Sequence, residues 1–308
     1  MVDDCIVADE SAWKRLLSCR GIGLSMAKRL VGSFGSAAAA VSADAGRLER
    51  IAGVSERTAK ALHREIARSR LDEEEGWLVR NGGRHIVFGF SGYPSLLCPT
   101  PDPPPMLRCR GSLPPEGAPC VAIVGTRSAT AYGLRQAARI TAGLIERGFS
   151  VVSGGARGID AEVHRTAIRF GGRTIVVLGS GLACPYPSEH AGMFEQVIAH
   201  GGAILSEVSV HQSPRPGLFP RRNRIISGIS HAVVMVEAPC RSGAMVTARL
   251  AVEEHGRDAM AVPGAADSHM SAGCHMAIRN GWAQLVTSSE DVVEALRGDY
   301  TASRSMAQ

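Results

Sequence analysis

The sequence lacks several features that would assign it to a common class of protein. None of its eight cysteines forms the C-x-x-C pair that zinc ribbons and dithiol redox sites need. No apolar run approaches the roughly 18–20 residues of a membrane-spanning helix. The acidic start is not followed by the apolar stretch of a signal peptide. We therefore expect a cytoplasmic protein with free thiols, no structural disulfide, no bound metal and no membrane association.

Two common nucleotide-binding fingerprints are also missing. The sequence contains no G-x-x-x-x-G-K-[ST] loop, and Lys14, Lys28 and Lys60 are its only lysines. The glycines at 154–158 and 179–181 do not have the G-x-G-x-x-G spacing of a dinucleotide site. These absences disfavour NAD chemistry and P-loop hydrolysis, and we expect no cofactor.

Three parts of the chain differ in character. Residues 1–75 read as short helices punctuated by glycine, residues 76–297 as an α/β domain, and residues 298–308 as a polar tail. Two glycine turns in the first part resemble helix-hairpin-helix turns, although a helical bundle that binds a protein fits them equally well. Prolines are dense at 93–119, where apolar extended stretches on both sides favour an ordered connector over a flexible linker.

From Cys120 onward, apolar runs alternate with glycine-rich loops and helical stretches. The apolar runs lie at 121–124, 149–152, 174–178 and 231–236, and each leads into a loop of small, polar or charged residues. Continuous apolar strands that alternate with helices predict a parallel sheet with helices on both faces. In such folds ligands bind beyond the carboxyl ends of the strands, so we expect the site at these loops.

Positive charge is concentrated in segment 219–226, which reads Phe-Pro-Arg-Arg-Asn-Arg-Ile-Ile. The segment lies within 208–236, where no Asp or Glu occurs, so nothing local in the sequence neutralises its arginines. A patch of this kind suits a polyanion, most commonly a nucleic acid. A solvated basic loop is the plainer alternative. Arg127 and Arg157 sit in two of the glycine-rich loops, where they would add positive charge.

Four other residues allow a catalytic interpretation. Asp160 and His164 lie four residues apart on one predicted helix, and Glu207 and Glu237 each follow an apolar strand. A hydrolase of glycosyl bonds could use carboxylates placed in this way. The alternative, which we favour, is that Asp160 orients the glycine-rich loop while His164 packs beneath it.

Taken in order along the chain, the motifs between Arg84 and Leu296 closely resemble those of the DprA (Smf) family of bacterial DNA-processing proteins. The segments that carry the resemblance are 123–127, 132–133, 153–160 with His164, 177–182, 186–187, 205–207, 219–226, 236–238, 242–243, 247–248, 261–264 and 273–274. The resemblance implies an α/β, Rossmann-like parallel sheet preceded by a small helical domain of the helix-hairpin-helix (SAM-like) type. It also implies a homodimer that is not an enzyme.

By this resemblance the protein binds single-stranded DNA without regard to sequence and loads the RecA recombinase onto it, in DNA uptake, natural transformation and recombination. Single-strand-binding protein is a further candidate partner. Arg127 matches the arginine with which the family grips the DNA backbone, and Phe219 is a plausible platform for stacking a base. The DNA-binding residues that we expect are Gly125, Thr126, Arg127, Gly154, Gly155, Arg157, Phe219, Arg221, Arg222, Asn223, Arg224, Ser242 and Gly243.

The chain departs from the family pattern at a few positions. Thr126 replaces a serine, Ala183 an aspartate, Ala244 a serine and His275 an asparagine, which changes polar groups of the pocket but keeps its arginines. The chain ends soon after Leu296, so we expect no C-terminal winged-helix domain. A nucleotide-binding protein or nucleoside-monophosphate hydrolase of a related fold is the alternative function, and a scaffold for recombination proteins is a third.

The sequence also leads to an expectation about variants. Arg127→Ala, or Arg222→Ala combined with Arg224→Ala, should weaken DNA binding strongly while the protein stays folded. The matching Arg-Asn-Arg element at 222–224 would supply the second half of the pocket.

Overall fold

The computed structural model of the chain describes residues 2–19, 21–51 and 53–296. The chain divides into two compact units, Met1–Tyr93 with Pro104–Arg108, and Pro94–Pro103 with Cys109–Gln308. The first unit therefore continues past residue 75, where the sequence places the end of the helical part. The predicted polar tail, 298–308, lies outside the described residues.

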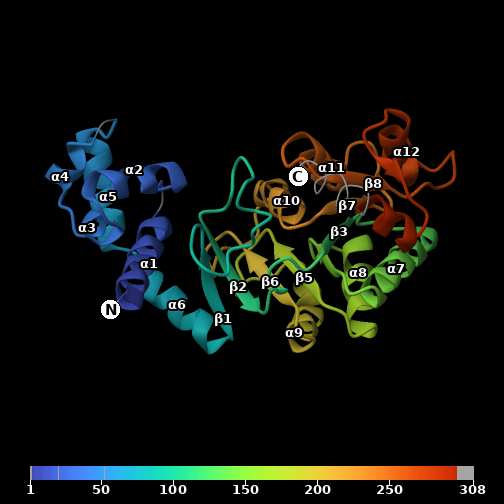
Figure 1. Cartoon of the computed structure of the whole chain (residues 1–308), viewed down its shortest axis with the longest axis horizontal. Helices are drawn as coiled ribbons and strands as arrows, with labels where there is room; N and C mark the ends of the chain where they lie inside the picture. The colour runs from blue at the N-terminus through green and yellow to red at the C-terminus, as the bar shows by residue number, and fades with distance from the viewer. Residues whose placement is uncertain (1, 20, 52, 297–308) are drawn as a thin grey trace, which may run out of the picture. The chain divides into compact units, whose positions relative to one another are not determined.

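The first unit is mainly helical (Figure 1). Its described elements are α1 Val2–Ser18, α2 Leu24–Phe34, α3 Ala37–Val41, α4 Ala45–Glu49, α5 Glu56–Ala67, α6 Leu71–Arg80 and β1 Gly83–Val87. Two turns repeat one geometry: Gly21 and Gly53 have φ angles of 84° and 78°, which glycine adopts without strain. The following residue, Ile22 or Val54, is buried and donates its N–H to the carbonyl three residues earlier. The two glycine turns are thus related hairpins.

The second unit is built on a parallel sheet. Strands β3 to β9 lie in the order β6-β5-β4-β3-β7-β8-β9, and neighbours pair in parallel. Their bounds are β3 Cys120–Val124, β4 Ser150–Ser153, β5 Thr174–Leu178, β6 Ala203–Ser206, β7 Ala232–Met235, β8 Asp258–Ala261 and β9 Gln284–Leu285. Every residue of β3 to β7 is buried, as expected for strands covered on both faces.

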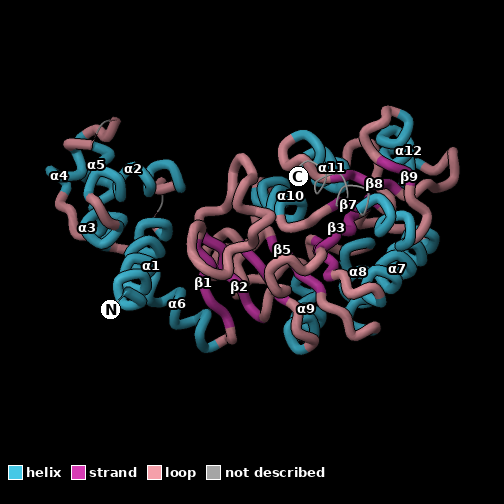
Figure 2. The backbone as a smooth tube through the Cα atoms, in the orientation of Figure 1, coloured by secondary structure: helices cyan, strands magenta, loops and turns pink. Residues whose placement is uncertain are grey.

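Helices cover both faces of this sheet (Figures 1 and 2). One face carries α7 Ala131–Glu146, α8 Ile159–Arg169 and α9 Ala191–Ala199, and the other carries α10 Leu218–Gly228 and α11 Gly243–Glu253. The remaining helical segments are α12 Ala272–Arg279 and the short turns Ser188–His190 and His269–Ser271. The core between α7, α8 and the sheet is mostly aliphatic, for example at Ile140, Val163 and Ile123. The predicted parallel sheet with helices on both faces is confirmed.

The chain changes direction across the sheet between β3 and β7. From β3 it adds β4, β5 and β6 on one side, then returns to place β7 on the other side of β3 and continues to β8 and β9. Such a switch point leaves a crevice beyond the carboxyl ends of the two neighbouring strands. The loops after β3, β4 and β7 border this carboxyl edge of the sheet, where the sequence places the site.

The proline-rich segment is held by packing and hydrogen bonds. Leu97 is fully buried, and a Cβ on Gly228 of α10 would lie 2.5 Å from its Cδ1. The side chain of Arg257 donates to the carbonyl of Leu96 at 3.2 Å. The segment leads into β2, Met106–Gly111. Residues 94–103 therefore belong structurally to the second unit.

Glu237, which follows β7, fixes the loop after β3. Its buried carboxylate accepts the N–H of Thr130 at 2.9 Å and the Thr130 hydroxyl at 2.6 Å, and its carbonyl accepts the N–H of Thr126 at 2.7 Å. The same Thr130 hydroxyl caps α7 by accepting the N–H of Gly133. A Cβ on Gly133 would lie 2.1 Å from a Glu237 carboxylate oxygen. The site loop thus depends on a glycine at this position.

We predict that Gly133→Ala lowers the free energy of unfolding by about 1–3 kcal/mol, because the added methyl displaces the Glu237 carboxylate. Gly192→Ala in α9 is the matched control, since nothing lies within 4 Å of a Cβ there. It should leave stability unchanged or raise it by up to about 1 kcal/mol. Urea unfolding measures both variants, and a Gly133→Ala variant as stable as the wild type would contradict this packing.

Candidate nucleic-acid interface

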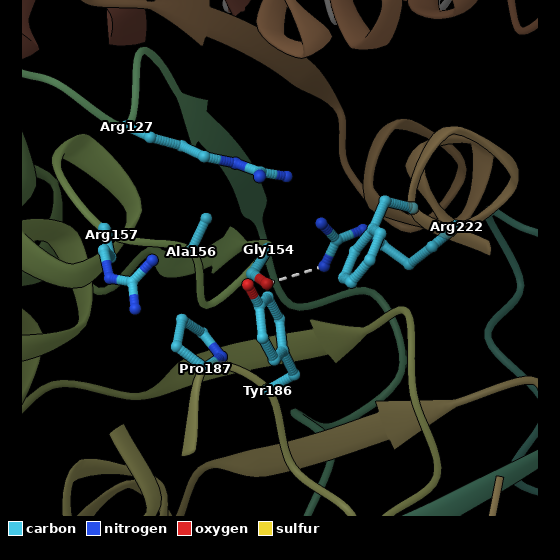
Figure 3. A pocket seen from close by; sticks show the side chains of 8 residues that line it. Arg127, Gly154, Ala156, Arg157, Tyr186, Pro187 and Arg222 are labelled. Atoms are coloured by element: carbon cyan, nitrogen blue, oxygen red, sulfur yellow. Dashed lines mark hydrogen bonds between the residues drawn. The ribbon is translucent and has the colours of Figure 1, made fainter. Parts of the chain in front are cut away.

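A groove of about 1060 Å³ lies at the switch point of the sheet. The loops after β3 and β7, together with α10 and α11, form its walls. The charged side chains that line it are four arginines, Arg127, Arg222, Arg241 and Arg249, and one aspartate, Asp160. A smaller cavity of about 20 Å³ shares Arg127, Tyr186 and Phe219 with the groove (Figure 3). Because one water needs about 10–15 Å³ by this measure, this small cavity has room for a single water, whereas the groove has room for a nucleotide.

Arg222 ties α10 to the carboxyl ends of β4 and β5. Its side chain is 7% exposed and donates to the carbonyl of Gly154 at 2.6 Å and to the carbonyl of Val177 (Figure 3). Burial lowers the pKa of Arg222 to about 10, against the opposing effect of Asp160. The guanidinium stays charged at neutral pH, but its donors face the protein interior. Arg222 therefore supports the groove from beneath.

Arg224 is held by carboxylates. It is 8% exposed; its two terminal nitrogens donate to the carboxylate of Glu207 at 2.7 and 3.0 Å, and its Nε donates to Asp102 at 2.9 Å. The exposed Arg221 donates to Glu207 as well, at 3.0 Å. Carboxylates from outside the acid-free stretch 208–236 therefore neutralise part of the basic segment. Glu207 follows β6 and Asp102 belongs to the proline-rich segment, so the neutralising charges come from elsewhere in the fold.

Arg127 lines the groove with an exposed positive charge. It is exposed and, among the described residues, has no ion pair or hydrogen bond. Its guanidinium lies 5.7 Å from the centroid of the Phe219 ring, a cation–π contact. The Phe219 ring in turn lies 5.5 Å from that of Tyr186, at a tilt of 54°. The structure thus brings together the arginine after β3 and the aromatic residue at the start of α10, as the sequence predicts.

The glycine-rich loops are shaped by internal hydrogen bonds. The N–H of Thr126 donates to Glu237, and the N–H of Gly154 donates to Asp160 at 3.1 Å, so neither is available to a phosphate. A Cβ on Gly154 would lie 2.5 Å from a terminal nitrogen of Arg222, and one on Gly125 would lie 2.4 Å from Ile159. These glycines allow close approach of neighbouring elements. Their role in the site is to position the arginines.

The other expected residues lie between α10 and α11 or in the loop after β4. Asn223 donates to the carbonyl of Gly243 at 3.3 Å, and the Ser242 hydroxyl caps α11. Gly155 has a φ of 68° and packs against Val176 of β5 and Phe194 of α9. Arg157 is exposed but donates its Nε to Glu189 at 2.6 Å, so its charge is partly matched in the free protein. Arg157 lines the small cavity but not the groove.

Asp160 and His164 have separate hydrogen-bond partners. Asp160 accepts the N–H groups of Gly154 and Ala156 and thereby orients the glycine-rich loop. His164 is fully buried beneath that loop, with its Nδ1 2.8 Å from the Thr174 hydroxyl. Burial raises the pKa of Asp160, and the Arg222 guanidinium opposes this shift. The structural interpretation of these two residues is confirmed.

The lining residues absent from the sequence-based set include Tyr186, Arg241 and Arg249. Tyr186 belongs to the Tyr-Pro motif at 186–187, and Arg241 directly precedes the motif at 242–243, so a signal near each of them existed. Arg249 lies within α11, where only the crossing of that helix over the groove shows its place.

Two further properties bear on the class of site. The described residues contain no group of three or more His, Cys, Asp or Glu side chains arranged to hold a metal ion. Within the same ranges, no helix combines the length and apolar character that a membrane crossing requires.

We predict that Arg224→Ala lowers the free energy of unfolding by about 2–3 kcal/mol, because it leaves the nearly buried Glu207 without its main partner. The expectation that this arginine can be removed without affecting folding is thereby revised. Arg221→Ala, at the exposed partner of the same Glu207, should change stability by less than about 1 kcal/mol. Equal losses in chemical denaturation for the two variants would contradict the burial of the Arg224 pair.

A second prediction concerns pH. Burial, with added repulsion from His190 and Arg222, lowers the pKa of His164 from 6.5 to about 3. Below pH 6.5 the unfolded chain takes up a proton that the folded chain does not, so stability is lost as pH falls towards 3. Between about pH 6 and about pH 4, the wild type should lose up to about 1.4 kcal/mol per pH unit more than His164→Asn.

The control for this measurement is His200→Asn, at an exposed histidine of the second unit. It should keep the wild-type dependence of unfolding free energy on pH. If His164→Asn keeps that dependence too, His164 is not buried in its neutral form.

Comparison with known proteins identifies relatives of both parts of the chain. The sequence profile of the family described as DNA recombination-mediator protein A matches residues 84–297. That of a SAM-like helix-hairpin-helix tandem matches residues 14–68, which confirms the predicted helical domain.

Individual relatives agree with this result. Protein Smf of Synechocystis sp. is 44% identical over 208 residues, which are 66% of this chain and 52% of that protein. A putative DNA processing protein DprA of Mycobacterium tuberculosis is 41% identical over 244 residues, 75% of this chain and 61% of that protein. The matched part thus spans little more than half the length of these relatives.

Solved structures show the same likeness. The X-ray structure of DNA processing protein A from Streptococcus pneumoniae matches with a TM-score of 0.77 at 31% identity, covering 90% of this chain and 95% of that chain. A structure of DNA processing protein A from Helicobacter pylori, described for its single-stranded DNA binding mode, matches at 0.61 and 28% identity over 70% and 97% of the two chains. The resemblance seen in the motifs is confirmed, and the chain belongs to the family of DNA recombination-mediator protein A, the DprA (Smf) proteins.

Proposed function

We propose that this protein binds single-stranded DNA in the groove at the carboxyl edge of its sheet, without regard to base sequence, as a non-catalytic mediator of recombination. The observation that carries the proposal is the lining of the groove, where four arginines face one aspartate. This aspartate, Asp160, accepts two backbone N–H groups and interacts electrostatically with the Arg222 guanidinium. The exposed arginines of the groove therefore keep a net positive charge for phosphates.

The preference for single strands follows from the aromatic residues at one end of the groove. Phe219 and Tyr186 lie side by side, and Tyr186 is 36% exposed. An aromatic ring stacks with a base only when the base is unpaired, and such stacking tolerates every base. Contacts through arginine to phosphate carry no sequence information either. The solved Helicobacter pylori relative, whose description names single-stranded DNA binding, supports the same ligand.

The proposed contacts divide into two groups. Arg127 and Phe219 contact the strand directly, and Arg157 joins them when phosphate replaces Glu189. Arg221 is exposed but paired with Glu207, outside the lining of the groove. The second group positions the first. Its members are Gly125, Thr126, Gly154, Gly155, Arg222, Asn223, Arg224, Ser242 and Gly243.

Family membership supports the remaining parts of the proposal. We propose that the protein acts in the cytoplasm as a homodimer, and that it loads RecA recombinase onto the strand during DNA uptake, natural transformation and recombination. Single-strand-binding protein is proposed as a further partner. The alternative, a nucleotide hydrolase, gains no support from the carboxylates near the edge. Glu207 and Glu237 are engaged by arginines and by Thr130, respectively.

We predict that Arg127→Ala weakens binding of single-stranded DNA at least tenfold and lowers the salt dependence of log K by about 0.7, the value for one lost phosphate contact. The exposed position of Arg127 should leave folding unchanged. Fluorescence anisotropy with a labelled oligonucleotide across a salt series measures both quantities, and duplex of the same sequence should bind more weakly. The control is Arg169→Ala at the end of α8, near the opposite edge of the sheet.

If Arg127→Ala binds single-stranded DNA with wild-type affinity, the proposal that the groove is the binding site is wrong. Equal affinity for duplex would contradict the stacking argument. Release of base from a nucleoside monophosphate by the purified protein would instead favour the hydrolase.

A further inference from the structure

Two arginines on the α11 side of the groove stand outside the family motifs considered above. Arg241, in the loop after β7, is exposed and has no ion pair or hydrogen bond among the described residues. Arg249 of α11 is also exposed; its guanidinium lies 5.5 Å from the centroid of the Trp282 ring, and its Nη1 lies 3.4 Å from a carboxylate oxygen of Glu253. Both side chains line the groove.

Two arginines of α10 that do not line the groove differ electrostatically. Arg221 and Arg224 meet the carboxylates of Glu207 and Asp102, two positive charges against two negative ones. A phosphate that approached them would have to displace these pairs, and in the case of Arg224 the pair is nearly buried.

On the α11 side of the groove, a bound phosphate would displace few existing contacts of the arginines. Arg241 is unpaired within the described ranges, and the contact of Arg249 with Glu253 is an exposed pair four residues apart on one helix. Exposed pairs of this kind are weak, whereas an arginine binds phosphate with two parallel hydrogen bonds. The positive charge available to a bound strand therefore continues from Arg127 to Arg241 and Arg249.

The α11 wall of the groove is also long enough to contact an extended ligand. Arg249 lies six residues after the start of α11 at Gly243, which places it about 9 Å along the helix axis. The exposed Val246 lines the groove in the same stretch and offers an apolar surface. Because nucleotides in a stacked strand advance by about 3.4 Å each, this wall is longer than one nucleotide.

We propose that the bound strand leaves the Arg127–Phe219 end of the groove along α11, where Arg241 and Arg249 bind the phosphates of successive nucleotides above Val246. The strand does not run over Arg221 and Arg224. This inference rests on the proposed function, the binding of single-stranded DNA in this groove, and adds the path that the strand follows.

The path is tested by the length of DNA that each variant can bind. The double variant Arg241→Ala, Arg249→Ala is compared with the wild type and with Arg127→Ala, using labelled oligothymidylates of about 4 and about 16 nucleotides, lengths that bracket common single-strand sites. The control, Arg147→Ala with Arg169→Ala, removes two exposed charges at the ends of α7 and α8, near the opposite edge of the sheet. Thermal unfolding verifies that each variant is folded.

We expect the Arg241→Ala, Arg249→Ala variant to bind the long oligonucleotide at least tenfold more weakly, with a salt slope reduced by about 1.4 for two lost phosphate contacts. Its affinity for the short one should change less than twofold. Arg127→Ala should weaken both lengths, and the control neither.

Wild-type affinity of the double variant for the long oligonucleotide would overturn the path while leaving the proposed function intact. Equal weakening of both lengths would also overturn it, because the two arginines would then act at the Arg127 end. If the wild type binds neither oligonucleotide, the path and the proposed function fall together.

Discussion

The guanidinium of Arg222 holds the candidate interface together. It is nearly buried and donates to the carbonyls of Gly154 and Val177, so α10 is fixed to the carboxyl ends of β4 and β5. A buried charge persists only when its donors are satisfied and an opposite charge lies near, and Asp160 supplies that charge while it also shapes the loop after β4. Phe219, one turn earlier on α10, takes its place beneath Arg127 because of this arrangement.

A basic stretch of sequence is not the same as a basic surface. The arginines at 221–224 are the densest positive charge in the chain, yet the fold turns one of them towards backbone carbonyls and matches two others with Glu207 and Asp102. The charge that remains available is more dispersed. It lies on Arg127, in the loop after β3, and on Arg241 and Arg249 on the α11 side of the groove. This dispersal suits a flexible strand whose phosphates follow one another along a path.

Much of the fold could be predicted from the sequence because its signals are local. Parallel strands that are buried on both faces leave continuous apolar runs, and the loops that follow them carry the glycines of close packing. The placement of Arg127 and Phe219 at one edge follows from the same logic. The pairing of Arg224 could not be predicted, since Glu207 lies 17 residues away and Asp102 lies 122 residues away in the sequence. Arg249 likewise enters the groove only through the way α11 crosses it. Local patterns therefore locate the site, whereas tertiary contacts decide which of its charges are free.

The central claim is that unpaired DNA occupies the groove at the carboxyl edge of the sheet. The most direct measurement is ultraviolet cross-linking of the wild-type protein to a single-stranded oligonucleotide that carries photoreactive bases, followed by mass spectrometry of the cross-linked peptides. The account predicts cross-links at Tyr186 or Phe219, which expose rings at one end of the groove, together with peptides from α11. Cross-links confined to the helical unit, or to the ends of α7 and α8 near the opposite edge of the sheet, would contradict it.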